Sequence, residues 1–236
     1  MKKQRLSVGL LLIITPLLFM GAFTLLQINF EYPDILRQPA GYVLERFAAG
    51  GSGLVINWYA MLLSAMLFIP IAVLLQPTLS HPDAGQPSMT WTLPLATVFG
   101  VLAGVVQMLG FVRWPFLVPS LAAIYRDPAS SAAAREATQI IFQAFNQTAG
   151  VGIGEHLGYL FTSLWTVLVG LAMIRSPIFP RWLGWAGALT ALGIFAGVLE
   201  PAGLALAGTI NAVAYIIWAV WLLATGVLLL RLGKKP

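Results

Sequence analysis

Glu155 and His156 are the residues of this chain whose side chains are best suited to chemistry, an acid beside an imidazole in an otherwise apolar stretch. Such groups can act as general base and general acid. A carboxylate at membrane depth is costly unless it has a partner. Neighbouring side chains on a helix point about 100° apart, so these two do not easily share one metal. The pair therefore indicates a candidate ligand or acid–base site, and no metal site is predicted.

Several polar residues could complete that site. They are Arg113, Arg135, Asn146, Gln147 and Tyr159. Glu155 could accept hydrogen bonds from the arginines and amides, which would close a polar cavity beside an apolar wall. Arg113 has a second interpretation, because Arg113-Trp114-Pro115 ends an apolar segment and resembles an interfacial anchor. The local sequence favours the anchor over a counter-ion for Glu155.

Small residues surround the acid at helical spacing. Gly150, Gly154 and Gly158 recur every four residues and would share one helical face, as would Gly100 and Gly104. In a membrane, a face of small residues lets a second helix approach closely. These glycines are therefore predicted to be helix-packing positions.

The composition places these residues in a membrane protein. Of 236 residues, 59% are hydrophobic and 9% are charged, whereas a soluble domain has roughly a quarter charged residues. The absence of cysteine excludes disulfides and thiolate metal sites. The net charge of +5 does not indicate nucleic acid as a partner, because the basic residues flank the apolar segments.

Six apolar segments are long enough to cross a bilayer, and we predict an all-α bundle of six transmembrane helices in one domain, 1–236. The segments lie near residues 6–28, 54–76, 91–112, 150–174, 182–199 and 204–230. The first is longer than the apolar core of a signal peptide, so we interpret it as an uncleaved helix. We interpret residues 29–53 as a connecting loop rather than as a short interfacial helix.

The connection between the third and fourth segments is the longest. Polar residues in it form one helical stripe: Arg135, Gln139, Gln143, Asn146 and Gln147. We predict an extracytoplasmic or interfacial helix that begins at Asp127-Pro128 or Ser130-Ser131. Continued to Ile174, it would measure about 69 Å, more than twice a hydrocarbon core of about 30 Å. A bend is therefore expected at Gly150 and Gly152.

An even number of spans places both termini on one side, and the basic residues predict which side that is. Eight lie on the side of the termini: Lys2, Lys3, Arg5, Arg175, Arg181, Arg231, Lys234 and Lys235. Five lie opposite: Arg37, Arg46, Arg113, Arg126 and Arg135. The excess of positive charge predicts cytoplasmic termini in the inner (plasma) membrane.

His81 and Asp83 are too few for a metal site in a loop broken by proline.

A set of short motifs resembles a known family. They are Phe111-Val112-Arg113-Trp114-Pro115, Tyr125, Arg135, Phe142, Phe145-Asn146, Gly154-Glu155-His156-Leu157-Gly158, Leu164-Trp165 and Pro180-Arg181-Trp182-Leu183-Gly184. Together they resemble a bacterial multi-pass membrane family catalogued as domain of unknown function 4386. The resemblance implies multi-pass topology and no particular activity, cofactor or catalytic residue.

From the residues, we expect a small or amphiphilic ligand, or a membrane partner, to bind in an outward-facing polar pocket around Glu155. The alternatives are a transporter that works as an oligomer and an intramembrane enzyme with Glu155 and His156 as acid and base. A haem usually needs two axial ligands, and His156 is the only histidine at membrane depth, so no cofactor is predicted. The expected partners are the lipid bilayer, a small amphiphile or membrane protein, and a second copy of the chain.

Overall fold

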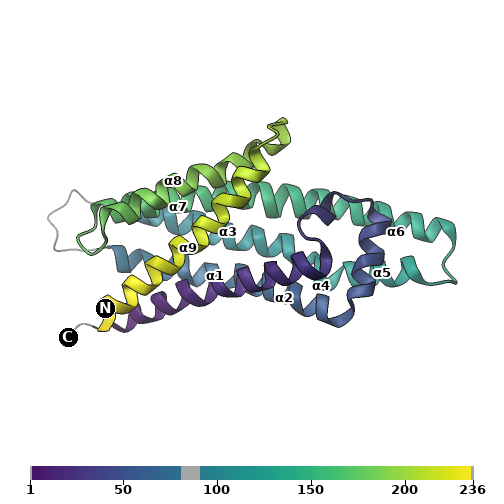
Figure 1. Cartoon of the computed structure of the whole chain (residues 1–236), viewed down its shortest axis with the longest axis horizontal. Helices are drawn as coiled ribbons and strands as arrows, with labels where there is room; N and C mark the ends of the chain where they lie inside the picture. The colour runs from purple at the N-terminus through teal and green to yellow at the C-terminus, as the bar shows by residue number, and fades with distance from the viewer. Residues whose placement is uncertain (1, 81–90, 235–236) are drawn as a thin grey trace. The chain divides into compact units, whose positions relative to one another are not determined.

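The computed structural model describes residues 2–80 and 91–234, and the regular elements within those ranges are helices (Figure 1). Six helical segments are long and apolar enough to cross a membrane, as the sequence predicts: Lys2–Phe30, Ala40–Leu79, Thr92–Arg126, Ala132–Arg175, Arg181–Ala202 and Ala207–Gly233. The chain is therefore a multi-pass membrane protein. His81 and Asp83 lie outside the described residues.

The first three spans comprise α1 (Lys2–Phe30), α2 (Ala40–Leu79), α3 (Thr92–Phe111), α4 (Arg113–Phe116) and α5 (Val118–Arg126). The remaining spans comprise α6 (Ala132–Phe145), a π-helix η3 (Asn146–Leu157), α7 (Gly158–Arg175), α8 (Arg181–Ala196), a 3₁₀ turn η4 (Gly197–Ala202) and α9 (Ala207–Lys234). A second 3₁₀ turn, η1 (Asp34–Arg37), joins α1 to α2.

The interpretation of residues 29–53 as a loop is wrong, because η1 and the first turns of α2 occupy most of it. Ala40, Val43, Leu44 and Phe47 are buried. Their spacing of three and four residues gives α2 an apolar face before it reaches its membrane-spanning part. Gly51, with φ 56° and ψ −152°, interrupts the helical geometry of α2. A conformation with positive φ is accessible to glycine at little cost, so the kink falls there.

The predicted helix after residue 129 begins at Ala132, and the Ser131 side chain caps it by accepting a hydrogen bond from the Ala134 N–H at 3.2 Å. This helix does not break before the fourth span. It continues through η3 into α7, and the expected bend is replaced by π-helical winding over Asn146–Leu157. Gly150 and Gly152 both lie in that segment, whose winding is rare in proteins and often found at functional sites.

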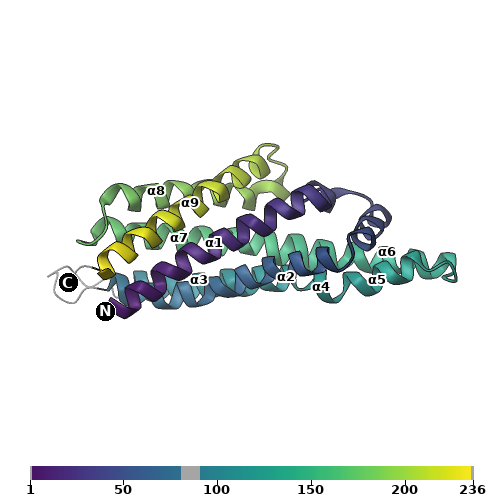
Figure 2. The same ribbon diagram turned by 60° about the horizontal axis from the view of Figure 1, so that its bottom comes forward.

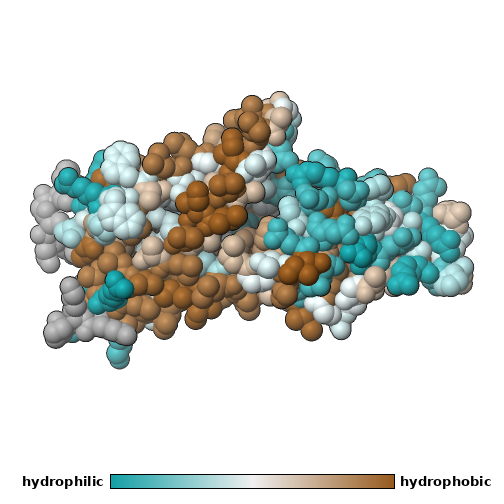
Figure 3. Space-filling view, in the orientation of Figure 1, coloured by the Kyte–Doolittle hydropathy of each residue, from teal (hydrophilic) through white to brown (hydrophobic). Residues whose placement is uncertain are grey.

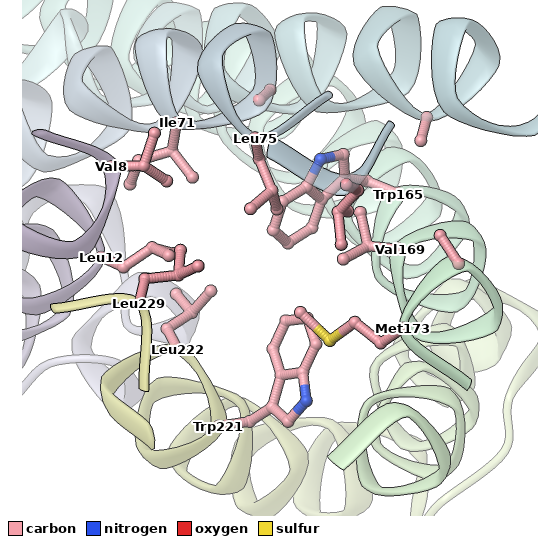
Figure 4. Close-up of a cluster of buried hydrophobic side chains, with 14 of the residues drawn as sticks. Val8, Leu12, Ile71, Leu75, Trp165, Val169, Met173, Trp221, Leu222 and Leu229 are labelled. Atoms are coloured by element: carbon pink, nitrogen blue, oxygen red, sulfur yellow. The ribbon is translucent and has the colours of Figure 1, made fainter. Parts of the chain in front are cut away.

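The chain divides into two compact units. The first unit comprises Met1–Leu17, Ala65–Val105 and His156–Pro236. In it α8 packs against both α7 and α9 (Figures 1 and 2). Its core is a buried cluster that includes Leu12, Ile71, Leu75, Trp165 and Trp221 (Figure 4). The indole N–H of Trp221 donates to the carbonyl oxygen of Leu183 at 2.8 Å, which joins α9 to α8.

Glycines bring the helices of the first unit close together. A Cβ on Gly100 would lie 2.7 Å from Nε1 of Trp165, and one on Gly104 would lie 2.7 Å from Cγ1 of Ile69. Gly158 is buried at the start of α7. Outside, large apolar side chains are exposed on this unit, among them Trp182 and Leu189, and α1 and α9 present a hydrophobic surface (Figure 3). Lipid would cover such a surface.

The second unit comprises Leu18–Ser64 and Val106–Glu155. Its core is aromatic: the Trp58 and Trp114 rings stack at a centroid distance of 4.4 Å, and Phe30, Phe47 and Phe142 surround Trp114. Within this unit α5 and α6 form a helical hairpin, whose surface in Figure 3 is mostly hydrophilic. This unit holds most of the polar residues singled out in the sequence.

Candidate functional site

Arg113 lies in the interior of the second unit, with 7% of its surface exposed. Its Nη1 donates to the carbonyl oxygen of Gly110, and its Nη2 donates to Oδ1 of Asn146 at 3.1 Å. The guanidinium also lies 5.0 Å from the centre of the Trp114 ring. The interpretation of Arg113 and Trp114 as an interfacial anchor is therefore wrong, because both are buried and the guanidinium has polar partners inside the fold.

Asn146, the first residue of η3, joins three segments that are far apart in the sequence. Besides accepting from Arg113, its Nδ2 donates to the carbonyl oxygen of Leu36 in η1 at 3.1 Å. One side chain thus satisfies the arginine of α4 and an η1 carbonyl that has no helical partner of its own. The start of η3 is held in place by these two bonds.

Two glycines of η3 make room for this arrangement. A Cβ on Gly150 would lie 2.8 Å from Cζ of Arg113. A Cβ on Gly154 would lie 2.9 Å from the Cα of Gly110, which means that η3 and α3 touch backbone to backbone there. A larger residue at either position would require the neighbour to move, and neither a hydrogen-bonded guanidinium nor a backbone moves cheaply.

Glu155 is half-buried near the C-terminal end of η3, and its charge acts on the Arg113 guanidinium. The structure thus brings together three of the predicted site residues, Arg113, Asn146 and Glu155. Gln147 is exposed. This part of the site is a buried cation with an amide and a carboxylate around it, an arrangement that stabilises the charge and holds η3 against α3 and α4.

His156 and Tyr159 belong to the first unit. His156 is half-buried, and its Nδ1 is enclosed with no hydrogen-bond partner in the described part of the chain. Tyr159 packs against Tyr215 of α9 at a ring-centroid distance of 5.8 Å. Gly197 lies beside it, where a Cβ would be 2.7 Å from Cδ2 of Tyr159. Tyr159 is therefore part of the packing between α7, η4 and α9.

Arg135 lines a cavity of the second unit with a volume of about 500 Å³, formed by α2, α5 and α6. The lining residues are Glu45, Ala49, Tyr125, Arg126 and Arg135. Nη2 of Arg135 donates to the carbonyl oxygen of Asp127 at 3.0 Å, which ties the side chain to the turn between α5 and α6. Its Nε is buried and has no partner among the described residues.

Four of the five lining residues were not predicted as site residues. Glu45 and Ala49 lie in the segment interpreted as a loop, about 80 residues before their neighbours on α5. Tyr125 stands among the family motifs, and Arg126 was assigned to the same side of the membrane as Arg135. The assignment of Arg126 and Arg135 to the same side of the membrane was the one sequence feature that pointed to this cavity. The hairpin that brings the two arginines together depends on a turn at Asp127.

The cavity offers cationic and hydrogen-bonding side chains beside small and aromatic ones. Within residues 2–80 and 91–234, no group of three or more His, Asp or Glu side chains is placed to hold a metal ion. The chemistry of the lining is therefore that of hydrogen bonding and charge, which suits recognition of a polar or charged group.

Comparison with known proteins gives one short and one extensive match. A glycerol-3-phosphate acyltransferase of Synechococcus sp. (strain CC9902) is 48% identical over 50 residues, which are 20% of this chain and 25% of that protein. The chain thus covers about a quarter of that relative's length. No solved structure matches. The family described as Domain of unknown function (DUF4386) matches residues 7–226. The chain, with its six spans and its arginine-centred polar network, belongs to the DUF4386 family.

Proposed function

We propose that this membrane protein binds a small or amphiphilic ligand in the cavity lined by Glu45, Ala49, Tyr125, Arg126 and Arg135. The observation that carries the proposal is the cavity itself, about 500 Å³ in volume and rich in polar side chains in a chain with 9% charged residues. Pockets of about 300–1,000 Å³ that combine a few polar groups with apolar surface are typical ligand sites.

An apolar strip beside the cavity favours an amphiphile. On α4 and α5, Phe116 is 61% exposed and Ile124 is 44% exposed. With Ser120 and Ala123, which are also exposed, they follow helical spacing and lead to Tyr125 and Arg126. A ligand with its polar end between the arginines could place an apolar chain along this strip, where it would remain in contact with lipid.

The network around Arg113 supports this cavity indirectly. Asn146 fixes the C-terminal end of α6 to η1, and Arg135 projects from the same helix into the cavity. Glu155, Arg113 and Asn146 therefore act as the polar support of the site rather than as its lining. With cytoplasmic termini, as the distribution of basic residues predicts, the cavity would open on the extracytoplasmic side.

The test is a cavity-filling variant, Ala49→Trp, compared with Ala137→Trp, which adds the same side chain at an exposed position of α6. Native mass spectrometry would measure amphiphiles that co-purify with the full-length protein and small molecules added to it. The acyltransferase that matches over 50 residues is named for glycerol-3-phosphate, so that compound belongs among the additions. We expect Ala49→Trp to lower ligand occupancy and Ala137→Trp to leave it unchanged. Equal occupancy in the two variants would refute the proposal.

A further inference from the structure

The charge of the cavity indicates what kind of group it accepts. The two arginines and the one glutamate of its lining give an excess of one positive charge. Both arginines come from the α5–α6 hairpin, and the glutamate comes from α2. Arginine presents a planar set of N–H donors that matches the oxygens of carboxylates and phosphates. The lining is therefore suited to a negatively charged group.

Arg135 is oriented for such a group before any ligand arrives. Asp127 follows α5, its N–H bonds to the carbonyl of Ala123 at 3.1 Å, and its side chain accepts from the Ala129 N–H at 2.9 Å. This turn presents the carbonyl that holds Nη2 of Arg135. Because that carbonyl holds only one edge of the guanidinium, the side chain is fixed while donors remain for another partner.

The Nε of Arg135 is enclosed within the fold, as are the Nε atoms of Arg46 and Arg113. The Nε of Arg135 has no hydrogen-bond partner in the described part of the chain, although its surface is almost entirely covered. A buried N–H donor without an acceptor is rare in folded proteins, because it loses its bond to water and gains nothing in return. An anion in the cavity would therefore meet the other N–H groups of the guanidinium, because Nε itself is covered by the fold.

Tyr125 and Gly41 shape the other side of the cavity. A Cβ on Gly41 would overlap the hydroxyl oxygen of Tyr125, so the tyrosine side chain lies directly against the first turn of α2. The glycine lets the phenol reach α2, and the phenol becomes part of the lining with Glu45 and Ala49. The polar end of a ligand would thus meet a cation on the hairpin side and an aromatic wall towards α2.

We infer that this cavity binds an anionic group, a phosphate or a carboxylate, carried either by a lipid headgroup or by a small soluble molecule. The inference rests on the proposed function and names the chemistry of its ligand. Arg135 and Arg126 supply the attraction. Glu45 repels an anion and so limits the affinity of the cavity for it. Removing an arginine should therefore weaken anion binding, and removing the glutamate should strengthen it.

The experiment measures lipid retention by the full-length protein in native mass spectrometry, with phosphatidylglycerol and phosphatidylcholine of identical chains. The expected result is preferential retention of phosphatidylglycerol. Arg135→Gln should lower that preference about tenfold, because one charge-assisted bond is lost. Arg126→Gln, at an exposed position whose change should not disturb folding, should lower it as well. Glu45→Gln should raise it about twofold, and Glu136→Gln, an exposed acid outside the lining, should not.

Inorganic phosphate distinguishes the two sources of the anion. If phosphate displaces phosphatidylglycerol, the site recognises the charged group alone and a soluble anion suffices. If the preference for phosphatidylglycerol persists in excess phosphate, the anion is part of a lipid. Equal retention of both lipids, unaltered by Arg135→Gln and Glu45→Gln, would overturn the anion assignment and leave ligand binding intact. If neither lipid nor phosphate is retained, and Ala49→Trp equals the unmodified protein, the proposed function fails too.

Discussion

Asn146→Ala is the substitution that tests most directly how the second unit is held together. It removes the acceptor of Arg113 Nη2 at 3.1 Å and the donor to the Leu36 carbonyl at 3.1 Å. A hydrogen bond to a charged group contributes about 1.5–3 kcal/mol, and a neutral one contributes about 1 kcal/mol. Because both bonds are only part-buried, the lower end of these ranges applies, and we expect a loss of about 2–3 kcal/mol.

The assay is thermal unfolding of the detergent-solubilised protein, followed by circular dichroism. For chains of about 150–250 residues, 1 kcal/mol corresponds to about 2–4 °C, so the midpoint should fall by about 4–12 °C. Gln147→Ala is the matched control, since Gln147 is the next residue of η3 and is exposed. Its effect should stay within about 0.5 kcal/mol.

The result that would refute this reasoning is an Asn146→Ala midpoint equal to that of Gln147→Ala. A double-mutant cycle with Arg113→Met sharpens the test, because it isolates the part of the loss that belongs to the pair. A coupling free energy near zero would show that the bond from Arg113 to Asn146 contributes nothing to stability. We expect a coupling of about 1.5–2 kcal/mol, the lower end of the range for a hydrogen bond to a charged group.

Two further substitutions test the packing of each unit by the same assay. Gly150→Ala should destabilise the protein by about 1–3 kcal/mol, because the new methyl group meets the Arg113 guanidinium. The control is Gly152→Ala, whose Cβ would lie 3.5 Å from the nearest neighbouring atom, the Gln147 carbonyl oxygen. It should be neutral or stabilising by up to about 1 kcal/mol. Trp221→Phe should cost about 1–3 kcal/mol, because the indole bond to the Leu183 carbonyl is lost and the smaller ring leaves a gap in the buried core. Trp182→Phe, at a site that is 63% exposed, should be close to neutral, and equal effects of the two tryptophan variants would contradict the assignment of that bond.

The membrane spans could be predicted because hydropathy is a local property. Each span has a window of about 18 apolar residues with few charges, and no knowledge of its neighbours is needed to recognise it.

The start of α2 was missed for a related reason. Its buried residues, Ala40, Val43, Leu44 and Phe47, have helical spacing, but charged residues such as Glu45 and Arg46 stand among them. The charge content indicated a loop, and the spacing indicated a helix; the spacing was the better guide.

The position of Arg113 could not be predicted because its partner is remote in sequence. The motif Arg113-Trp114-Pro115 is consistent with an anchor at the membrane surface, and the local sequence contains nothing that contradicts this. The acceptor on Asn146 lies 33 residues away, and the carbonyl that orients Asn146 lies a further 110 residues from it in sequence. Long-range contacts of this kind depend on how α4, η1 and η3 pack, which a single sequence does not specify.

The polar stripe predicted from Arg135 to Gln147 does not lie on one inward face, because Gln143 and Gln147 are exposed and the buried residues of α6 are Thr138 and Phe142. Asn146 bonds to η1, and Arg135 turns its Nε into the fold. The apolar residues Ile140, Ile141 and Phe145 are 59%, 40% and 49% exposed. In water, so much exposed apolar surface on one helix would be unfavourable. Beside lipid, or beside another apolar surface, the arrangement is the stable one, because polar groups then find their partners within the protein. In this part of the chain polar residues such as Asn146 and apolar ones such as Phe142 therefore both face the interior, and polarity alone does not mark the side of α6 on which a ligand would bind.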